Sequence, residues 1–368
     1  MFKIIVLKIG IDAKRAFTNY SGLGNYSRDV INSLCKFKSL DVHLFTTKKN
    51  ISHYKKPENS KIHIPKNYLL KSYWRLFGLN KIIQKENLQI FHGLSNEIPL
   101  GLNVKIKSVV TIHDVIFKKY PQFYNSFDRF IYSLKTYYSC KKSDKIITVS
   151  KQTKEDLIKY FKINPEKIEV IYQSCHIAFK TPLKNINISK KYKLPKDYIL
   201  FVGTIEKRKN LKFLLNAIKD NPSINLVCVG EKKSYYRHIL NFLHNEKINN
   251  KIFFLEVKSV NDLSDIYKKA KFLVYPSFYE GFGLPIVEAM GVGCPVVSSR
   301  TSSMQEICQD AAKLFDPKNA DFKKFVNMIN PGCAIVMGGP HTFDGPWSSE
   351  ADYLVVGYAD RSVVNLAN

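Results

Sequence analysis

The stretch KFLVYPSFYEGFGLPIVEAMGVGCPVVSS (residues 271–299) decides the fold of this chain. It begins with a short β-branched and aromatic run, passes through a glycine-rich turn into an apolar helical pattern, and ends in a second β-branched run. A strand followed by a helix and another strand indicates a β–α–β unit with parallel strands. Pro285 suits the first helical turn, where its missing N–H removes no hydrogen bond.

The same alternation of strands and helices occurs in both halves of the 368-residue chain, and it restarts after residue 197. Ser150, directly after one expected strand, is a good N-cap for the next helix. We therefore expect an α/β fold of two doubly wound Rossmann-like domains that face a cleft. In the first half we predict strands at 3–12, 41–47, 89–95, 108–114, 145–150 and 167–173, with helices at 24–37, 126–142 and 150–161. In the second half we predict strands at 197–204, 224–231, 251–257, 271–277 and 295–299, with helices at 209–220, 234–246, 260–270 and 284–293.

The predicted domains are residues 1–180 and 181–329, joined through a polar, lysine-rich linker at 174–197. Residues 330–368 form an atypical tail, because no lysine follows Lys324 although lysine is abundant before it. Through GGPHTF and DYLVVG this tail resembles a fragment of the cobalamin-binding domains attached to radical-SAM enzymes. A natural fusion, a junction introduced near Asn330 and an ordinary extension all remain open, and we favour the junction. We infer no cobalamin chemistry from so short a fragment.

Composition favours a cytoplasmic protein. The seven cysteines are odd in number and scattered without a C-x-x-C pair, which argues against a disulfide framework or a structural zinc site. No apolar run reaches the roughly 18–20 residues that cross a bilayer. The apolar part of the first residues is short and lacks a cleavage site, so we expect a first strand rather than a signal peptide.

The net charge of +26 is unevenly distributed along the chain. Residues 1–190 hold 34 basic and 13 acidic residues, whereas residues 191–330 hold 22 and 14. Such an excess attracts anions such as lipid headgroups or phosphorylated substrates. A generally lysine-rich composition explains the charge equally well, and both interpretations stay open.

Residues 279–299 contain two glutamates, Glu280 before the glycine-rich turn and Glu288 after it. Gly281 and Gly283 let the backbone approach a ligand closely, and N–H groups at a helix start attract phosphate. Glu288, expected in the first helical turn, would reach the ribose hydroxyls of a nucleotide, while Glu280 would lie beside the group on its far phosphate. From spacing alone, a pair of solvated glutamates beside an ordinary turn is an equal alternative.

The stretch YPSFYEGFGLPIVEAMGVGCPVVSSRTSSMQEI (residues 275–307) resembles the donor-site motif of the retaining glycosyltransferases of family 4, which have the GT-B fold. In that family a Glu, seven residues and a second Glu lie within EGFGLPxxEAM, followed by G-x-P-V-V. The resemblance implies that Glu280 contacts the transferred sugar and Glu288 the ribose. It also implies that Gly281, Phe282, Gly283 and Leu284 bind the donor.

Three further stretches extend the resemblance over about residues 8–325. FVGTIEKRKNLKFLLNAI (residues 201–218) is similar to the family's diphosphate-binding turn and implies phosphate-binding roles for Lys209 and Arg208. A cation there neutralises the charge on a departing nucleoside diphosphate. The resemblance also places Gly203 and Thr204 at the donor, although Thr204 stands where many members have arginine. A solvated basic turn is the plainer alternative.

In the first half, NYSGLGNYSRDV (residues 19–30) resembles the family's glycine-rich loop that faces the donor phosphates. We rank Gly22 above Gly24 as a donor-binding residue, against the alternative of a tight turn. VVTIHDVIFKKYP (residues 109–121) places His113 at a strand end, where the family has a histidine near the reacting sugar. His92 also ends an expected strand and is the weaker candidate.

The sequence lacks two motifs that would indicate a bound metal or a nucleotide-binding loop. Residues 1–330 contain no D-x-D stretch to hold a divalent metal on a diphosphate, and the chain contains no Walker loop. We therefore expect no metal site and no cofactor, with Lys209, Arg208 and helix-start amides performing the metal's task. No nucleic-acid partner is expected.

The resemblance implies transfer of a hexose from a nucleotide diphosphate sugar, with retained anomeric configuration. The IHDVIFKKYP and GTIEKRKN stretches resemble the mannosyltransferase-like branch, so GDP-mannose is the expected donor. A lipid-linked or oligosaccharide acceptor in surface polysaccharide assembly, such as lipopolysaccharide O-antigen, is expected to bind the first domain. The aromatic and basic residues 66–81 are expected either to dock on the anionic inner face of the cytoplasmic membrane or to be buried core.

Two alternatives to the transferase stay open. A nucleotide-sugar epimerase of the same fold would act on donor without acceptor. A catalytically impaired protein that binds sugar nucleotide or membrane is the other alternative, because the tail of residues 330–368 replaces the helix that normally braces the first domain in the family.

Overall fold

The computed structural model of the chain describes residues 6–19, 22–47, 54–65, 73–182, 187–219, 221 and 223–318. These residues divide between Gln173 and Ser174 into two compact units. The predicted tail at 330–368 lies outside the described residues, as do residues 66–72 of the stretch expected to dock on a membrane.

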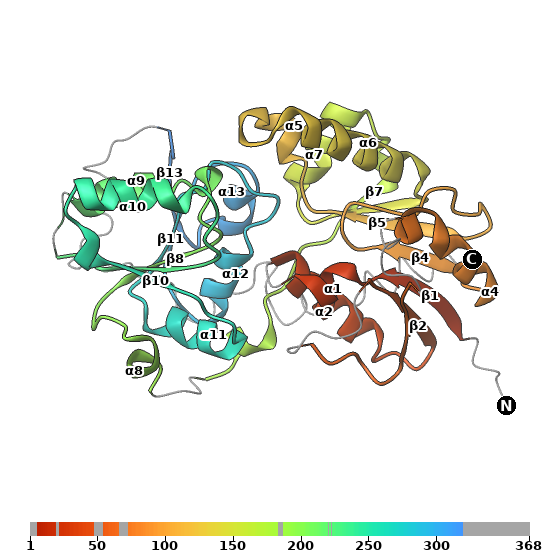
Figure 1. Ribbon diagram of the computed structural model, residues 1–368, viewed down its shortest axis with the longest axis horizontal. Helices are drawn as coiled ribbons and strands as arrows, with labels where there is room; N and C mark the ends of the chain where they lie inside the picture. The colour runs from red at the N-terminus through yellow and green to blue at the C-terminus, as the bar shows by residue number, and fades with distance from the viewer. Residues whose placement is uncertain are drawn as a thin grey trace. The chain divides into compact units, whose positions relative to one another are not determined.

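The described residues of the first unit form a parallel sheet with strand order β3-β2-β1-β4-β5-β6-β7. Helices cover both of its faces (Figure 1). Neighbouring residues along a strand point to opposite faces, so Val109 packs with helices α1 and α2 while Val110 packs with α4, α5, α6 and α7. The elements are β1 (Leu7–Asp12), α1 (Lys14–Thr18), α2 (Gly22–Leu34), β2 (Leu40–Phe45), β3 (Ser60–His63), η1 (Trp74–Gly78), α4 (Leu79–Lys85), β4 (Ile90–Gly93), β5 (Lys107–Ile112), α5 (Ile116–Lys119), η2 (Pro121–Phe123), α6 (Ser126–Lys142), β6 (Lys145–Thr148), α7 (Lys151–Phe161), η3 (Pro165–Lys167) and β7 (Ile168–Val170).

The described residues of the second unit form another parallel sheet, with order β10-β9-β8-β11-β12-β13. Helices α9 and α10 pack on one face through a continuous apolar core, and α12 contacts strands β11 and β12. The elements are η4 (Ile177–Lys180), α8 (Ile188–Tyr192), β8 (Ile199–Val202), η5 (Lys207–Lys209), α9 (Leu211–Lys219), β9 (Leu226–Val229), α10 (Tyr236–Asn245), η6 (Asn249–Lys251), β10 (Ile252–Leu255), α11 (Val260–Lys269), β11 (Leu273–Tyr275), α12 (Leu284–Gly291), β12 (Val296–Ser299), α13 (Ser303–Cys308) and β13 (Lys313–Phe315).

The predicted fold class, two doubly wound parallel α/β sheets, is confirmed. The prediction missed strands β3 and β13, which lie at sheet edges and are short and partly exposed. An edge strand pairs on one side only, so it needs neither the length nor the apolar character of a central strand.

The segment expected to be a polar linker is partly built into the second unit. Ala178 and Phe179 are buried, and the Phe179 ring packs edge-on against Tyr267 of α11 with centroids 5.6 Å apart. The Ser264 hydroxyl donates to the Ala178 carbonyl at 2.7 Å. Buried apolar side chains and hydrogen bonds therefore attach this lysine-rich stretch to the second unit.

Ser150 caps α7 as predicted, and this cap allows a stability test. Its hydroxyl accepts from the backbone N–H of Thr153 at 3.1 Å, and Ser150 is fully buried. We expect Ser150→Ala to lower the free energy of unfolding by about 1–2 kcal/mol, measured by urea denaturation, because the buried amide loses its acceptor. Ser126→Ala, at the exposed first residue of α6, is the control and should change it by less than about 0.5 kcal/mol. Equal effects of the two changes would contradict the assigned cap.

Candidate functional site

The carboxyl edge of the second sheet carries the densest group of predicted residues. Strand order reverses between β8 and β11, and ligands of doubly wound sheets bind at such a switch point. Gly203 and Thr204 follow β8, and the turn that contains Lys209 ends at Asn210 with φ 54°. The Lys209 side chain lies across Gly203, since a Cβ on Gly203 would be 3.5 Å from the Cε of Lys209.

Lys209 and Glu280 form a buried ion pair at this edge. The Lys209 Nζ donates to Glu280 Oε1 at 2.7 Å and to the Tyr275 hydroxyl at 2.9 Å. Only 9 % of Lys209 and 7 % of Glu280 is exposed, so neither charge is substantially solvated. Tyr275 ends β11, and Glu280 lies in the loop that follows. The pair thus joins the turn after β8 to the loop after β11.

Arg208 holds the same carboxylate from a second direction. Its Nη1 lies 2.9 Å from Glu280 Oε2 and donates to the Tyr279 carbonyl at 2.7 Å. Its Nη2 donates to Glu206 Oε1 at 2.6 Å, and its own carbonyl accepts from the Phe278 N–H at 3.0 Å. Both oxygens of Glu280 are therefore paired with cations.

The protonation states of this group follow from burial and charge. Burial raises the pKa of Glu280, but the Arg208 and Lys209 charges outweigh burial and hold the pKa at about 2. Burial lowers the pKa of Lys209, and the Glu280 charge opposes that shift. A carboxyl with so low a pKa stays ionised at neutral pH, so Glu280 can accept hydrogen bonds but cannot act as a general acid.

The loop from Gly281 to Leu284 is fixed by α13 and by glycine geometry. The Ser303 hydroxyl donates to the carbonyls of Glu280 and Phe282 at 3.0 and 2.8 Å, and the Ser302 hydroxyl accepts from the Glu280 N–H at 3.1 Å. Gly283 has φ 110°, a conformation that residues with a side chain rarely adopt. Sequence reasoning missed Ser302 and Ser303, which lie in the serine-rich run after β12.

Glu288 lies on α12, one turn further along than expected. The helix begins at Leu284, so Glu288 falls in its second turn, while Pro285 occupies the first turn as predicted. Glu288 is 5 % exposed, and its Oε2 accepts from the Tyr267 hydroxyl at 2.9 Å. Sequence reasoning also missed Tyr267, a buried tyrosine of α11 whose partner could not be read from the chain order.

In the first unit, His113 follows β5 and is buried. Its Nε2 lies 2.8 Å from the Leu94 carbonyl oxygen, and its Nδ1 lies 3.2 Å from Gln173 Nε2. A carbonyl only accepts, so Nε2 carries the proton and Nδ1 accepts from the Gln173 amide. Burial lowers the pKa of His113 to about 4, so this ring is neutral. Its backbone N–H donates to Asn96 Oδ1 at 2.9 Å.

The glycine-rich stretch of the first unit enters α2, which begins at Gly22. A Cβ on Gly24 would lie 1.9 Å from the Asn19 carbonyl oxygen, so a side chain at this position would displace the backbone of the α1–α2 turn. Gly22 is exposed. Packing against the α1–α2 turn thus explains why residue 24 is a glycine. The higher rank of Gly22 as a donor-binding residue stays a prediction.

Tyr26 of α2 connects the glycine-rich stretch to His113. Its ring packs edge-on against the His113 ring with centroids 4.8 Å apart, and its hydroxyl lies 3.1 Å from Thr111 Oγ1. His92, the weaker candidate, lies within β4 and pairs with the same Thr111 hydroxyl at 2.9 Å. The first unit therefore brings together α2, β4 and the end of β5, and the second brings together Gly203, Arg208, Lys209 and Glu280.

Two family models match the chain. The model described as "Glycosyl transferases group 1" matches residues 184–329, and the model described as "Glycosyltransferase Family 4" matches residues 20–177. Together they include both groups of site residues.

Two curated relatives are mannosyltransferases. The chain is similar to the O-antigen chain mannosyltransferase B of Escherichia coli, with 32% identity over 241 residues that are 63% of this chain and 62% of the relative. It is also similar to the O-antigen chain mannosyltransferase RfbU of Salmonella typhimurium, with 32% identity over 247 residues that are 67% of this chain and 65% of the relative. The match thus spans a little less than two thirds of each relative's length.

Solved structures share the fold. The sucrose-phosphate synthase from Thermosynechococcus elongatus has a TM-score of 0.70 at 17% identity, over 98% of this chain and 95% of that chain. The Anabaena protein HepE, crystallised with UDP and glucose, has a TM-score of 0.66 at 15% identity, over 98% of this chain and 97% of its own. At such identities the likeness is one of fold, the two-domain GT-B arrangement of glycosyltransferases.

The low pKa of Glu280 predicts an acid-dependent contribution to stability. A carboxyl whose pKa falls on folding stabilises the native state fully above its ordinary value of 4.5, and this contribution is lost as pH falls toward 2. We expect Glu280→Gln to lower the free energy of unfolding at pH 7 by about 3 kcal/mol, because two buried cations lose their partner. Below pH 4.5 the difference between variant and wild type should shrink.

The control for this experiment is Glu246→Gln, since Glu246 pairs with Lys219 at 2.6 Å in a more exposed position. We expect a change below about 1 kcal/mol there. Parallel pH profiles for the wild type and Glu280→Gln would show that Glu280 has no depressed pKa.

The tautomer assigned to His113 predicts its titration by NMR. In the wild type we expect the ring to stay neutral down to about pH 5, because burial lowers its pKa to about 4. Gln173→Glu places a carboxylate beside Nδ1 and should raise the pKa, since it favours the imidazolium. Gln173→Met, which adds no charge, is the control and should leave it low. Wild-type titration near the ordinary value of 6.5 would contradict the assigned environment.

Proposed function

The chain belongs to the family 4 glycosyltransferases with the GT-B fold, and from this premise we propose that it transfers a hexose from a nucleotide diphosphate sugar to a hydroxyl acceptor with retention of configuration. The observation that carries the proposal is the arrangement of Arg208, Lys209 and Glu280 at the switch point of the second sheet. Two cations and one permanently ionised carboxylate meet where a ligand of this fold binds.

The two cations suit a departing diphosphate. Negative charge accumulates on the phosphate oxygen as the bond to the sugar breaks, and a preorganised cation stabilises that charge without reorganisation. Lys209 and Arg208 would exchange part of their pairing with Glu280 for pairing with phosphate oxygens. Because the site supplies these fixed cations, we propose that no divalent metal is needed.

Glu280 suits recognition of the sugar rather than covalent catalysis. Its pKa of about 2 makes it a weak base and a weak nucleophile, whereas an ionised carboxylate readily accepts bonds from sugar hydroxyls. The sugar would then pass through an oxocarbenium-like state, with the acceptor attacking from the face that the diphosphate leaves. The leaving phosphate would take the acceptor's proton.

His113 would contribute without proton transfer. Both of its ring nitrogens are engaged, by Leu94 and Gln173, and its pKa of about 4 keeps it neutral. We propose that it lies near the reacting sugar as a neutral, rigid ring. Glu288 would bind the ribose, and Gly22, Gly24, Gly203, Thr204, Gly281, Phe282, Gly283 and Leu284 would line the donor.

The functions of the two mannosyltransferase relatives support a narrower donor and acceptor. Both of the relatives named above are O-antigen chain mannosyltransferases, so we propose GDP-mannose as the donor and a lipid-linked or oligosaccharide acceptor in surface polysaccharide assembly. We propose that a lipid-linked acceptor is held at the inner face of the cytoplasmic membrane and that the enzyme acts there as a peripheral protein. Among the described helices, none combines the length and the apolar character that would let it cross a bilayer.

A transfer assay tests the proposal. Radiolabelled GDP-mannose is incubated with the protein and a lipid-linked glycan, beside Lys209→Met and Glu280→Gln. We expect label in the glycan with the wild type, a decrease of about 100-fold or more in kcat/KM for each variant, and unchanged transfer after EDTA treatment. Lys212→Met, an exposed lysine of the neighbouring helix α9, is the control and should transfer normally.

The other possible outcomes of this assay distinguish the alternative functions from transfer. Donor binding by the wild type without transfer to any acceptor would indicate a catalytically impaired binder, and donor conversion without acceptor would indicate an epimerase. Equal activity of Lys209→Met and wild type would contradict the assigned diphosphate site.

A further inference from the structure

Helix α6 of the first unit exposes its large apolar side chains. Phe127, Phe130, Leu134 and Tyr137 are 73%, 60%, 51% and 47% exposed. Their spacing of three and four residues places them in one row along the helix. A contiguous exposed apolar surface of this kind marks an interaction site.

The buried face of α6 shows that this exposure is not a packing accident. The helix buries Thr136, Ser139 and Cys140, which are small or polar. An ordinary surface helix does the opposite and turns its large apolar side chains to the core. The helix α6 thus exposes its largest apolar side chains. They contribute to stability only when they contact an apolar environment outside the protein.

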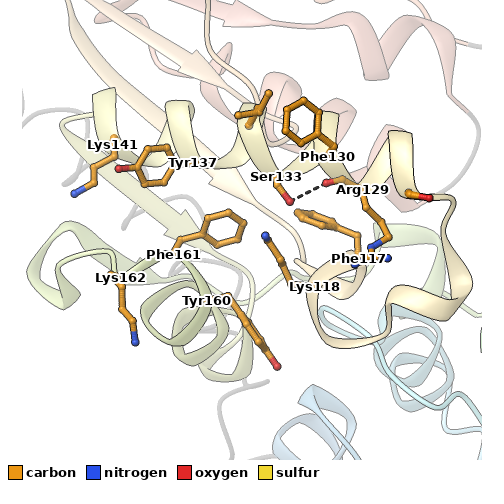
Figure 2. Close-up of a pocket in the computed structure, with 12 residues that line it drawn as sticks. Phe117, Lys118, Arg129, Phe130, Ser133, Tyr137, Lys141, Tyr160, Phe161 and Lys162 are labelled. Carbon is orange, nitrogen blue, oxygen red and sulfur yellow. Dashed lines mark hydrogen bonds between the residues drawn. The ribbon is translucent and has the colours of Figure 1, made fainter.

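A cavity of about 730 Å³ lies beside this row, between α6 and helices α5 and α7. Figure 2 shows the side chains of Phe117, Lys118 and Phe161 within it, below Phe130 and Tyr137 of α6. The Lys118 ammonium lies 5.3 Å from the centre of the Phe161 ring. Aromatic walls with a cation among them fit an amphiphile with an anionic head.

Four cations surround the cavity without carboxylate partners. Lys118, Arg129, Lys141 and Lys162 line it, and among the described residues no carboxylate lies within ion-pair distance of any of them. The buried Nε of Arg129 has no hydrogen-bond partner in the described part of the chain. An ordered water or an anionic ligand can supply the acceptor that this guanidinium nitrogen lacks.

We propose that α6 and this cavity form a docking surface for an anionic phospholipid bilayer. The apolar row of Phe127, Phe130, Leu134 and Tyr137 enters the boundary between headgroups and acyl chains, and Arg129 and Lys118 bind a headgroup phosphate. This inference deepens the proposed action at a membrane and does not depend on the transfer reaction. Docking through residues 66–81 stays a separate prediction: in the described part of that stretch Trp74 packs against the core, and Tyr73 and Phe77 are exposed.

Charge favours a lipid surface over a second copy of the chain. Asp128 is the only acidic residue of α6, against Arg129, Lys135, Lys141 and Lys142. Pairing two copies through this face would place like charges near each other without compensating carboxylates. An anionic bilayer instead attracts each of these cations and accepts the aromatic side chains.

Vesicle co-sedimentation of the full chain tests this surface. We expect binding to vesicles of phosphatidylcholine with phosphatidylglycerol and little binding to phosphatidylcholine alone. Phe127→Ser/Phe130→Ser should weaken binding by about tenfold or more, because two apolar anchors are lost. Arg129→Gln should weaken it by about fivefold, and Lys141→Gln/Lys162→Gln by more, in line with one headgroup attraction per cation.

Matched controls lie on the second unit. Leu240→Ser removes an apolar side chain that is 41% exposed on α10, and Lys269→Gln removes an exposed lysine at the end of α11. Both should bind vesicles like the wild type. Unchanged thermal unfolding of Phe127→Ser/Phe130→Ser is expected, because these side chains are already exposed.

The proposal is overturned if the wild type ignores phosphatidylglycerol, or if Phe127→Ser/Phe130→Ser binds as well as the wild type. A wild-type dimer in sedimentation equilibrium that this double variant dissociates would assign the surface to a second copy instead. Transfer of label to a water-soluble glycan should persist in the double variant. Loss of vesicle binding with transfer retained therefore tests docking separately from catalysis.

Discussion

The buried ion pair between Lys209 and Glu280 is the interaction on which the second unit's carboxyl edge depends. Each charge would be costly to bury alone, so the turn after β8 and the loop after β11 must approach each other for either to be stable. The Lys209 side chain lies against Gly203, and Gly283 allows the loop to enter α12. Backbone and charge thus impose one arrangement on two segments that are 71 residues apart.

The same pair is suited to exchange partners with a ligand. Glu280 pairs with both Arg208 and Lys209, and Arg208 also pairs with Glu206. A diphosphate offers more acceptor oxygens and more charge than Glu280 does. Glu280 stays ionised throughout, because its pKa lies far below neutrality. A site of this kind keeps its charges paired within the protein and needs no change of protonation when it binds a ligand.

The two units solve the problem of buried polar groups differently. In the second unit, opposite charges neutralise each other at the switch point. In the first unit, His113 is buried as a neutral ring whose two nitrogens have complementary partners in Leu94 and Gln173. On α6 the difficulty is the reverse, because apolar side chains face outward and no described segment covers them.

The sequence by itself determined the α/β class, the central strands and the Ser150 cap, because these depend on local periodicity and capping. Glu280 and the basic turn were singled out by resemblance to a known family, and their roles stay predictions. The sequence could not show strands β3 and β13, which exist through pairing at a sheet edge, or the partners Tyr267, Gln173, Ser302 and Ser303. Their distances from Glu288, His113 and Glu280 are settled only when the strands assemble. The orientation of α6 was also decided only by the tertiary structure. Periodicity reveals an apolar stripe on a helix, but it does not show whether that stripe faces the core or the solvent.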